Sequence, residues 1–254
     1  MTPPNQAPQP VHEPHQPISE YYRTEAERAG FLREIFDSTA TDYDKVERLL
    51  ALGTGPWYRR QALKRAGLAP GMQVVDVGFG TGLVAKEAIA IIGNPALLTG
   101  VDPSPAMMGA SPLAGKVKQV EGKAESIPLP DACADFISMG YALRHIGDLS
   151  AAFREFHRVL KPGGRLCILE ITKPEGAVGT ALLKGYMRGW VPLAAWLSRS
   201  ATHTPKIWRY YWDSIEACAP PQRILETLKA AGLADANRHV ELGTFSEYRA
   251  RKPG

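Results

Sequence analysis

The chain alternates short apolar runs with stretches that carry apolar residues at every third or fourth position. Helical spacing fills the intervals at residues 83–89, 150–160 and 222–231. Strands alternating with helices predict an α/β fold built on a parallel sheet. The expected strands are residues 74–77, 96–102, 117–121, 134–139, 165–171, 237–242 and 245–250.

Two regions depart from this alternation. Residues 19–66 have helical spacing in pieces, with Ser19 as a candidate N-cap, and residues 36–44 interrupt it with polar, cap-forming side chains. This pattern predicts an N-terminal helical lid that folds over a ligand. Residues 173–215 carry apolar helical stripes broken at Pro192, which predicts a helical insertion that covers the substrate before the last strands.

The apolar part of this insertion spans residues 182–197 and includes Trp190 and Trp196. Lys184 and Arg188 interrupt it, so we do not expect a transmembrane helix. Two interpretations stay open. The section forms the wall of an apolar pocket in which the two tryptophans contact a greasy ligand, or it packs on the core in the ordinary way. An interfacial helix at a membrane surface is compatible with the same pattern.

Composition limits the class of protein. With 254 residues, 44% of them hydrophobic, the chain suffices for one domain at residues 18–254, preceded by a disordered tail at residues 1–17 with six prolines. His12 and His15 lie in this tail and are read as linker residues. A net charge of +4 without a basic, aromatic run gives no nucleic-acid surface. Three cysteines without CxxC spacing indicate no disulfide framework and no metal site, which favours a reducing, cytoplasmic compartment.

A glycine loop follows the first predicted strand and leads into a helix. Its pattern, Asp76-x-Gly78-x-Gly80-x-Gly82, lets backbone amides approach a nucleotide-like ligand. Asp102 ends the next strand about 20 residues later, at the spacing of an acid that binds ribose hydroxyls. The acid before the turn would repel a pyrophosphate and attract a methionine ammonium group, which favours S-adenosylmethionine over a dinucleotide. A tight turn in a ligand-free domain is the plain alternative.

Further motifs carry a resemblance to a known family. With the glycine loop and Asp102, they resemble class I S-adenosylmethionine-dependent methyltransferases over most of residues 31–251. Residues 36–44 and the Leu-Arg step at 143–144 are most similar to the ubiquinone/menaquinone C-methyltransferase family. The resemblance implies a doubly wound, seven-stranded, mostly parallel sheet and a polyprenylated quinol precursor as substrate. The motifs are Ala-Glu-Ser-Ile-Pro-Leu-Pro-Asp at 124–131, Ala-Leu-Arg-His-Ile at 142–146 and Arg-Val-Leu-Lys-Pro-Gly-Gly-Arg at 158–165.

The resemblance also implies roles for individual residues. Tyr43 and Arg144 would face the substrate, and Asp102 would bind the cofactor ribose. Lys123 and Ala124 stand where the family recognises adenine. The residues implied at the methionine end of the cofactor are Asp76, Gly78, Gly80 and Gly82.

Methylation of an aromatic carbon requires the ring hydroxyl to be ionised or nearly so. His145 is a candidate general base near the end of the fourth predicted strand. We expect a pKa of about 6.5, which the charge of the neighbouring Arg144 would lower. Arg144 would stabilise the phenolate, and Tyr43 or Tyr141 would orient it. The alternative is that Arg144 and His145 only cap the next helix.

The chain departs from the family at four positions, and these departures keep other functions open. One alternative is a quinone-modifying enzyme like the rhodoquinone-forming quinone aminotransferase, and another is a non-catalytic cofactor-binding homologue. For the enzyme we expect a lipophilic quinol or phenol as partner, and contact with the inner face of the membrane and a homodimer are compatible with the sequence. The departures are Lys123 for a polar acceptor, His145 and Glu47 for asparagine, and Leu83 for an acid.

Overall fold

Seven strands form a single sheet in the part of the chain that the computed structural model describes, which is residues 13–16, 18–40, 44, 53–191 and 204–254. The strands are β1 (Val74–Val77), β2 (Leu98–Asp102), β3 (Lys118–Glu121), β4 (Ala134–Gly140), β5 (Leu160–Ile171), β6 (Ala234–Glu241) and β7 (Phe245–Arg251). Their order is β3-β2-β1-β4-β5-β7-β6, and β7 runs in the direction opposite to the other six strands. The predicted seven-stranded, mostly parallel sheet is confirmed.

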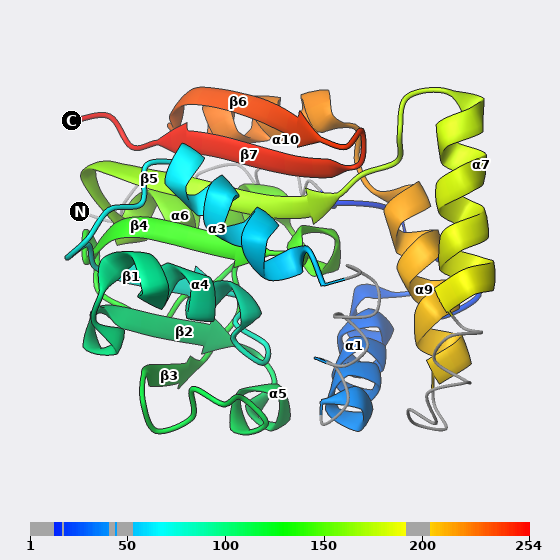
Figure 1. The fold of residues 1–254 in the computed structure, drawn as a ribbon, viewed down its shortest axis with the longest axis horizontal. Coiled ribbons are helices and arrows are strands. Elements are labelled where there is room, and N and C mark those ends of the chain that lie inside the picture. The colour runs from blue at the N-terminus through cyan, green and yellow to red at the C-terminus, as the bar shows by residue number, and fades with distance from the viewer. Residues whose placement is uncertain (1–12, 17, 41–43, 45–52, 192–203) are drawn as a thin grey trace, which may run out of the picture.

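Helices cover both faces of this sheet (Figure 1). α3 (Gly55–Arg65) and α4 (Leu83–Ile92) pack on one face, and α6 (Leu149–Val159) and α10 (Pro221–Ala230) on the other. β4 shows how the sequence fills both layers, because successive strand side chains point to opposite faces. Phe136 packs with α3 and α4, whereas Ile137 and Met139 pack with α6 and α10. The sheet is therefore doubly wound, as predicted.

A third group of helices lies beyond the carboxyl ends of the parallel strands (Figure 1). It comprises α1 (Glu25–Thr39), α7 (Ala177–Gly185), the π-helical turn η3 (Tyr186–Trp190) and α9 (Thr204–Ala217). These helices bury a cluster of their own that includes Ile35, Met187, Tyr210 and Trp212. The shorter elements are η1 (Pro95–Leu97), α5 (Pro105–Gly109) and the 3-10 turn η2 (Leu143–His145).

Several element boundaries differ from the sequence prediction, and two of them have a clear local cause. α1 begins after Thr24, whose Oγ1 accepts the N–H of Glu27 at 3.2 Å, so Thr24 and not Ser19 is the N-cap. The second strand begins at Leu98 rather than residue 96, because Pro95 starts a 3-10 turn there. In both places a local capping or proline effect overrides the apolar pattern.

Residues 161–164, which read as a turn before the fifth strand, lie inside β5. Leu160 already pairs with the first residue of β4, and Arg165 resumes the ladder two residues further along β4. The intervening residues form a bulge in which Gly163 adopts a φ of +79°. A glycine permits this left-handed backbone, so the chain bends without leaving the sheet.

The prediction of a disordered tail does not hold for residues 13–16. His15 is 6% exposed, and its ring lies 6.4 Å from that of Tyr22. The carbonyl of Pro14 accepts the N–H of Ala219 at 2.5 Å. Composition alone missed this segment because its partners come from distant parts of the chain. Residues 1–12 lie outside the described residues.

Candidate functional site

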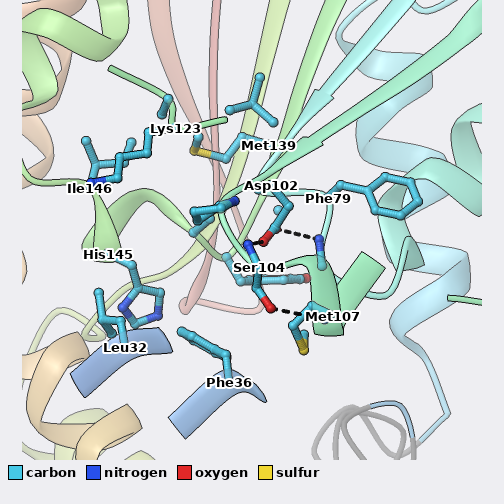
Figure 2. A pocket seen from close by; sticks show the side chains of 18 of the residues that line it. Leu32, Phe36, Phe79, Asp102, Ser104, Met107, Lys123, Met139, His145 and Ile146 are labelled. Carbon is cyan, nitrogen blue, oxygen red and sulfur yellow. Dashed lines mark hydrogen bonds between the residues drawn. The ribbon is translucent and has the colours of Figure 1, made fainter. Parts of the chain in front are cut away.

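A cavity of about 410 Å³ opens at the carboxyl ends of β1, β2 and β4. Its walls come from α1, α3, the β1–α4 and β2–α5 loops, and the segments that follow β3 and β4. The volume lies within the range of small-molecule sites, and the position is the one at which open α/β sheets bind ligands. Figure 2 shows Leu32 and Phe36 of α1 on the side of the cavity near His145.

The glycine loop borders this cavity with two of its three glycines. Gly78 and Gly80 line the cavity, and a Cβ on Gly78 would lie 2.7 Å from that of Ala142. Gly82 lies behind them as the N-cap of α4, with a φ of +85° and Phe79, Ser111 and Leu113 close to where its Cβ would be. The loop therefore has no room for a larger side chain at Gly78 or at Gly82.

Asp102 lines the cavity between two loops (Figure 2). Its carboxylate accepts the N–H of Gly80 at 2.7 Å and the N–H of Ser104 at 2.9 Å. Burial raises the pKa of Asp102 to about 6, against the effect of these two hydrogen bonds. The Oγ of Ser104 in turn donates to Asp37 of α1. The structure thus places a buried carboxylate beside the glycine loop at the cavity wall, and its contact with the cofactor ribose stays a prediction.

Asp76 is buried beneath the loop and is not among the residues that line the cavity. It accepts a hydrogen bond from the Oγ of Ser138 at 2.6 Å. Burial raises the pKa of this carboxyl to about 7. Its role at the methionine end of the cofactor stays a prediction.

Lys123 and Ala124 both line the cavity after β3. Ala124 is buried, and the carbonyl of Lys123 accepts the N–H of Ser126 at 3.1 Å in a short turn. Leu83, another departure from the family pattern, lines the same cavity from the start of α4. Three of the positions singled out from the sequence thus meet at one site, and the adenine contact stays a prediction.

The candidate residues in the segment after β4 do not all line the cavity. Tyr141 lines the cavity with a left-handed φ of +58°. Arg144 does not line it. Its guanidinium is buried in an ion pair with Glu170 and also donates to Ser214 and to the carbonyl of Tyr141, at 3.1 and 2.9 Å. The structure therefore does not bring Arg144 to the substrate side of the cavity, where the sequence analysis expected it.

His145 lines the cavity next to Arg144 in the chain. Its Nδ1 lies 3.1 Å from the hydroxyl of Tyr210, and the two rings stack at 5.6 Å. The edge of Phe36 meets its ring at 5.3 Å. In the described part of the chain, its buried Nε2 has no hydrogen-bond partner.

The charge state of His145 follows from this environment. Burial, then the charges of Arg144, Arg28 and His15, hold its pKa well below the ordinary value of 6.5. The direction expected for Arg144 is right, but an ionisation near 6.5 is not, because burial contributes most. The imidazole is neutral at neutral pH and one of its nitrogens is an acceptor.

Other predicted contacts lie elsewhere. Tyr43, Glu47 and Trp196 fall outside the described residues. Leu182 is 70% exposed and Trp190 is 53% exposed, and none of the described residues between 173 and 215 lines the cavity. The predicted pocket wall is therefore wrong for these two side chains, since this part of the insertion turns its buried side toward α1 and α9.

Sequence reasoning missed several lining residues. Arg59 of α3, Thr81 of the glycine loop and Ser104 after β2 all border the cavity. Arg59 had no distinguishing signal, because arginine is ordinary in an amphipathic helix and Arg60 follows it directly. The apolar stripe of α1 was visible in the sequence, but its place over the cavity was not.

Comparison with known proteins identifies the family. The model of the ubiE/COQ5 methyltransferase family matches residues 23–246. The chain is 30% identical over 234 residues to a ubiquinone/menaquinone biosynthesis C-methyltransferase of Geotalea daltonii, covering 89% of this chain and 98% of the relative. It is 32% identical to the protein of the same name from Ectopseudomonas mendocina, covering 90% and 91%.

Solved structures share the fold. A Thermotoga maritima methyltransferase described as a possible histamine N-methyltransferase superposes with a TM-score of 0.61 at 20% identity, covering 87% of this chain and 99% of the other. A methyltransferase from Methanococcus maripaludis gives the same TM-score at 19% identity, covering 87% and 94%. The family match extends over most of the chain, and a buried acid and a glycine loop lie together at the cavity wall. The chain therefore belongs to the ubiE/COQ5 methyltransferase family and is a methyltransferase that uses S-adenosylmethionine.

Proposed function

We propose that this methyltransferase C-methylates the ring of a phenolic, lipophilic quinol in quinone biosynthesis. The observation that carries the proposal is the position of His145, which lines the cavity among apolar side chains and whose pKa burial holds well below its ordinary value. Leu32, Phe36 and Met139 line the same cavity and suit an aromatic ring better than a polar substrate. The relatives named as ubiquinone/menaquinone biosynthesis C-methyltransferases support the same substrate class.

His145 would take the phenol proton. When bound, S-adenosylmethionine would supply an electrophilic methyl group. A ring carbon of the phenolate would take this group as the methyl–sulfur bond breaks and S-adenosylhomocysteine leaves, and loss of the proton from that carbon would restore the aromatic ring. If Nδ1–H donates to the Tyr210 hydroxyl 3.1 Å away, Nε2 is left as the acceptor. Nε2 is buried in the described structure, so the substrate would displace the side chains that cover this atom when it brings its proton within reach. Burial raises the pKa of the Tyr210 phenol far above its ordinary value, so the hydroxyl stays protonated beside the ring.

Arg144 and Tyr141 have separate parts in this proposal. Arg144 acts on the base through space, because its charge lowers the pKa of His145 while Glu170 holds the guanidinium. Tyr141 lines the cavity and is the tyrosine of the described residues that we assign to orient the substrate.

A test uses purified enzyme, a short-chain demethylated quinol and S-adenosylmethionine with a labelled methyl group. Mass spectrometry of the product should show one labelled methyl group on a ring carbon. An amine in place of a hydrogen or ether would instead indicate the rhodoquinone-forming type of reaction. Cofactor binding without any product from phenolic or quinol substrates would favour a non-catalytic homologue and contradict the proposal. Tyr210→Phe should retain cofactor affinity and slow methyl transfer.

The proposal includes contact with the inner face of the membrane, where a lipophilic quinol resides. Val178, Leu182 and Trp190 are exposed on the α7–η3 segment and would provide an apolar surface for it. Among the described residues, no helix has the length and hydropathy needed to span a bilayer. Sedimentation with anionic lipid vesicles tests the contact, and Leu182→Asp with Trp190→Asp should weaken it. Wild-type protein that stays in the supernatant would contradict it.

A further inference from the structure

One buried cation at the cavity wall has no role in the reaction as described so far. Arg59 of α3 is 1% exposed and lines the cavity together with Gly78, Thr81 and Tyr141. The next residue, Arg60, has the opposite placement, since its side chain is half exposed and pairs with Glu87 at 2.7 Å. α3 thus directs the Arg59 side chain toward the cavity rather than toward solvent.

The order of the strands locates Arg59 along the cavity. Lys123 follows β3 and Asp102 ends β2, while β1 and β4 come next in the sheet. The guanidinium carbon of Arg59 lies 5.7 Å from the ring centre of Tyr141, which directly follows β4. Its charge also acts on the carboxyl of Asp76 in β1. A nucleoside held by its ribose at Asp102, with its base near β3, directs its other end over β1 and β4, where Arg59 lies.

That other end of S-adenosylmethionine carries an ammonium and a carboxylate, and the carboxylate requires hydrogen-bond donors. Backbone amides of a glycine loop commonly provide them. In this loop, four of the five amides at residues 78–82 already donate within the protein. Gly78 and Phe79 donate to the carbonyl of Val101 at 2.8 and 3.1 Å, Gly80 to Asp102 at 2.7 Å, and Gly82 to the carbonyl of Phe79 at 2.8 Å.

We propose that Arg59 binds the carboxylate of the methionine moiety of S-adenosylmethionine, in place of the amides that the glycine loop uses internally. The guanidinium offers two parallel N–H donors that match the two carboxylate oxygens. The aromatic face of Tyr141 keeps the guanidinium at the end of β4. This role concerns the cofactor alone and holds whatever the methyl acceptor is.

Decarboxylated S-adenosylmethionine isolates the interaction, because it retains the sulfonium, the ammonium and the nucleoside. Titration calorimetry should show that the wild-type protein binds it about 10- to 100-fold more weakly than S-adenosylmethionine, the range of a charge-assisted contact. Arg59→Met should lower the affinity for S-adenosylmethionine by a similar factor and leave the affinity for the decarboxylated analogue nearly unchanged. Arg59→Lys keeps the charge without the planar fork and should fall between the two.

Arg60→Met is the matched control, since this arginine lies one residue away and pairs with Glu87 outside the cavity. It should bind both compounds as the wild type does. Equal losses for the two compounds in Arg59→Lys or Arg59→Met would overturn the proposal and leave Arg59 with a structural role. Should Arg59→Met fail to fold, as circular dichroism would show, the wild type still decides: equal affinity for both compounds overturns the proposal.

Discussion

Replacement of Asp102 by asparagine should remove a pH-dependent loss of stability from the ligand-free enzyme while it weakens cofactor binding. Burial raises the pKa of this carboxyl to about 6 from an ordinary value of 3.8. The charged form of this carboxylate therefore lowers the free energy of unfolding. Asparagine has no charge, so the variant avoids this pH-dependent cost. Its single amide oxygen replaces only one of the two oxygens that accept the N–H groups of Gly80 and Ser104, which subtracts about 1–3 kcal/mol at every pH.

The magnitude follows from the two pKa values. Each pH unit between the unfolded and folded pKa corresponds to about 1.4 kcal/mol, so the carboxylate lowers the free energy of unfolding by about 3 kcal/mol at pH 8. The folded protein holds the proton more tightly than the unfolded chain does. The penalty is therefore absent below about pH 4, grows as pH rises, and is complete above about pH 6.

Urea unfolding of wild type and Asp102→Asn at several values from about pH 4 to about pH 8 measures this difference. The variant should gain stability only toward the upper end of that range, and its affinity for S-adenosylmethionine should fall by about 1–3 kcal/mol. Asp135→Asn is the control with the opposite sign, because hydrogen bonds from Lys161 and Gln73 outweigh partial burial and lower the pKa of Asp135. A difference in stability between wild type and Asp102→Asn that stays the same from about pH 4 to about pH 8 would refute the reasoning.

Three further substitutions test the other parts of the site. The wild-type pH–rate profile should stay level through pH 6.5 and fall only well below it, and His145→Asn should remove that acidic limb; identical profiles would assign the base role to another group. Lys123→Asp should strengthen the binding of S-adenosylhomocysteine in calorimetry, because a carboxylate accepts the hydrogen bond of the adenine amino group. Unchanged or weaker affinity would show that Lys123 is not simply a missing acceptor. Arg144→Met should lower the free energy of unfolding by about 3–5 kcal/mol, since Glu170 would keep a buried charge without its partner. A loss below about 1 kcal/mol in urea unfolding would contradict the buried ion pair.

Local sequence signals predicted the sheet and the cofactor side of the cavity. The glycine loop and Asp102 each follow an apolar strand directly, and parallel strands bring their carboxyl ends to one edge. The residues that the pattern placed at strand ends, Gly78, Gly80 and Asp102, do line the cavity. Here the position of a residue at the end of its own strand decides where it lies, so little tertiary information was needed.

The substrate side of the cavity could not be predicted in the same way, because its residues are positioned by contacts between distant parts of the chain. Arg144 and His145 are adjacent, yet the 3-10 turn η2 buries the first against Glu170 and turns the second toward the cavity. The partner of His145 is Tyr210, which lies 65 residues away on α9. Arg59 also reaches the cavity only through the packing of α3. The pattern of apolar and polar residues does not predict which side of a short turn or a helix contacts a ligand.

The hydrogen bonds of Ser104 have a consequence for the order in which the enzyme takes up its substrates. Its N–H is held by Asp102 at 2.9 Å, and its hydroxyl is bonded to Asp37 on α1, the helix that also contributes Phe36 to the cavity. A ligand bound to Asp102 therefore stabilises the position of α1 through Ser104 and Asp37. The methyl acceptor must bind beside this helix. We expect compulsory-order kinetics with S-adenosylmethionine entering first. S-adenosylhomocysteine should then inhibit competitively against the cofactor and non-competitively against the methyl acceptor, and Ser104→Ala should loosen that order.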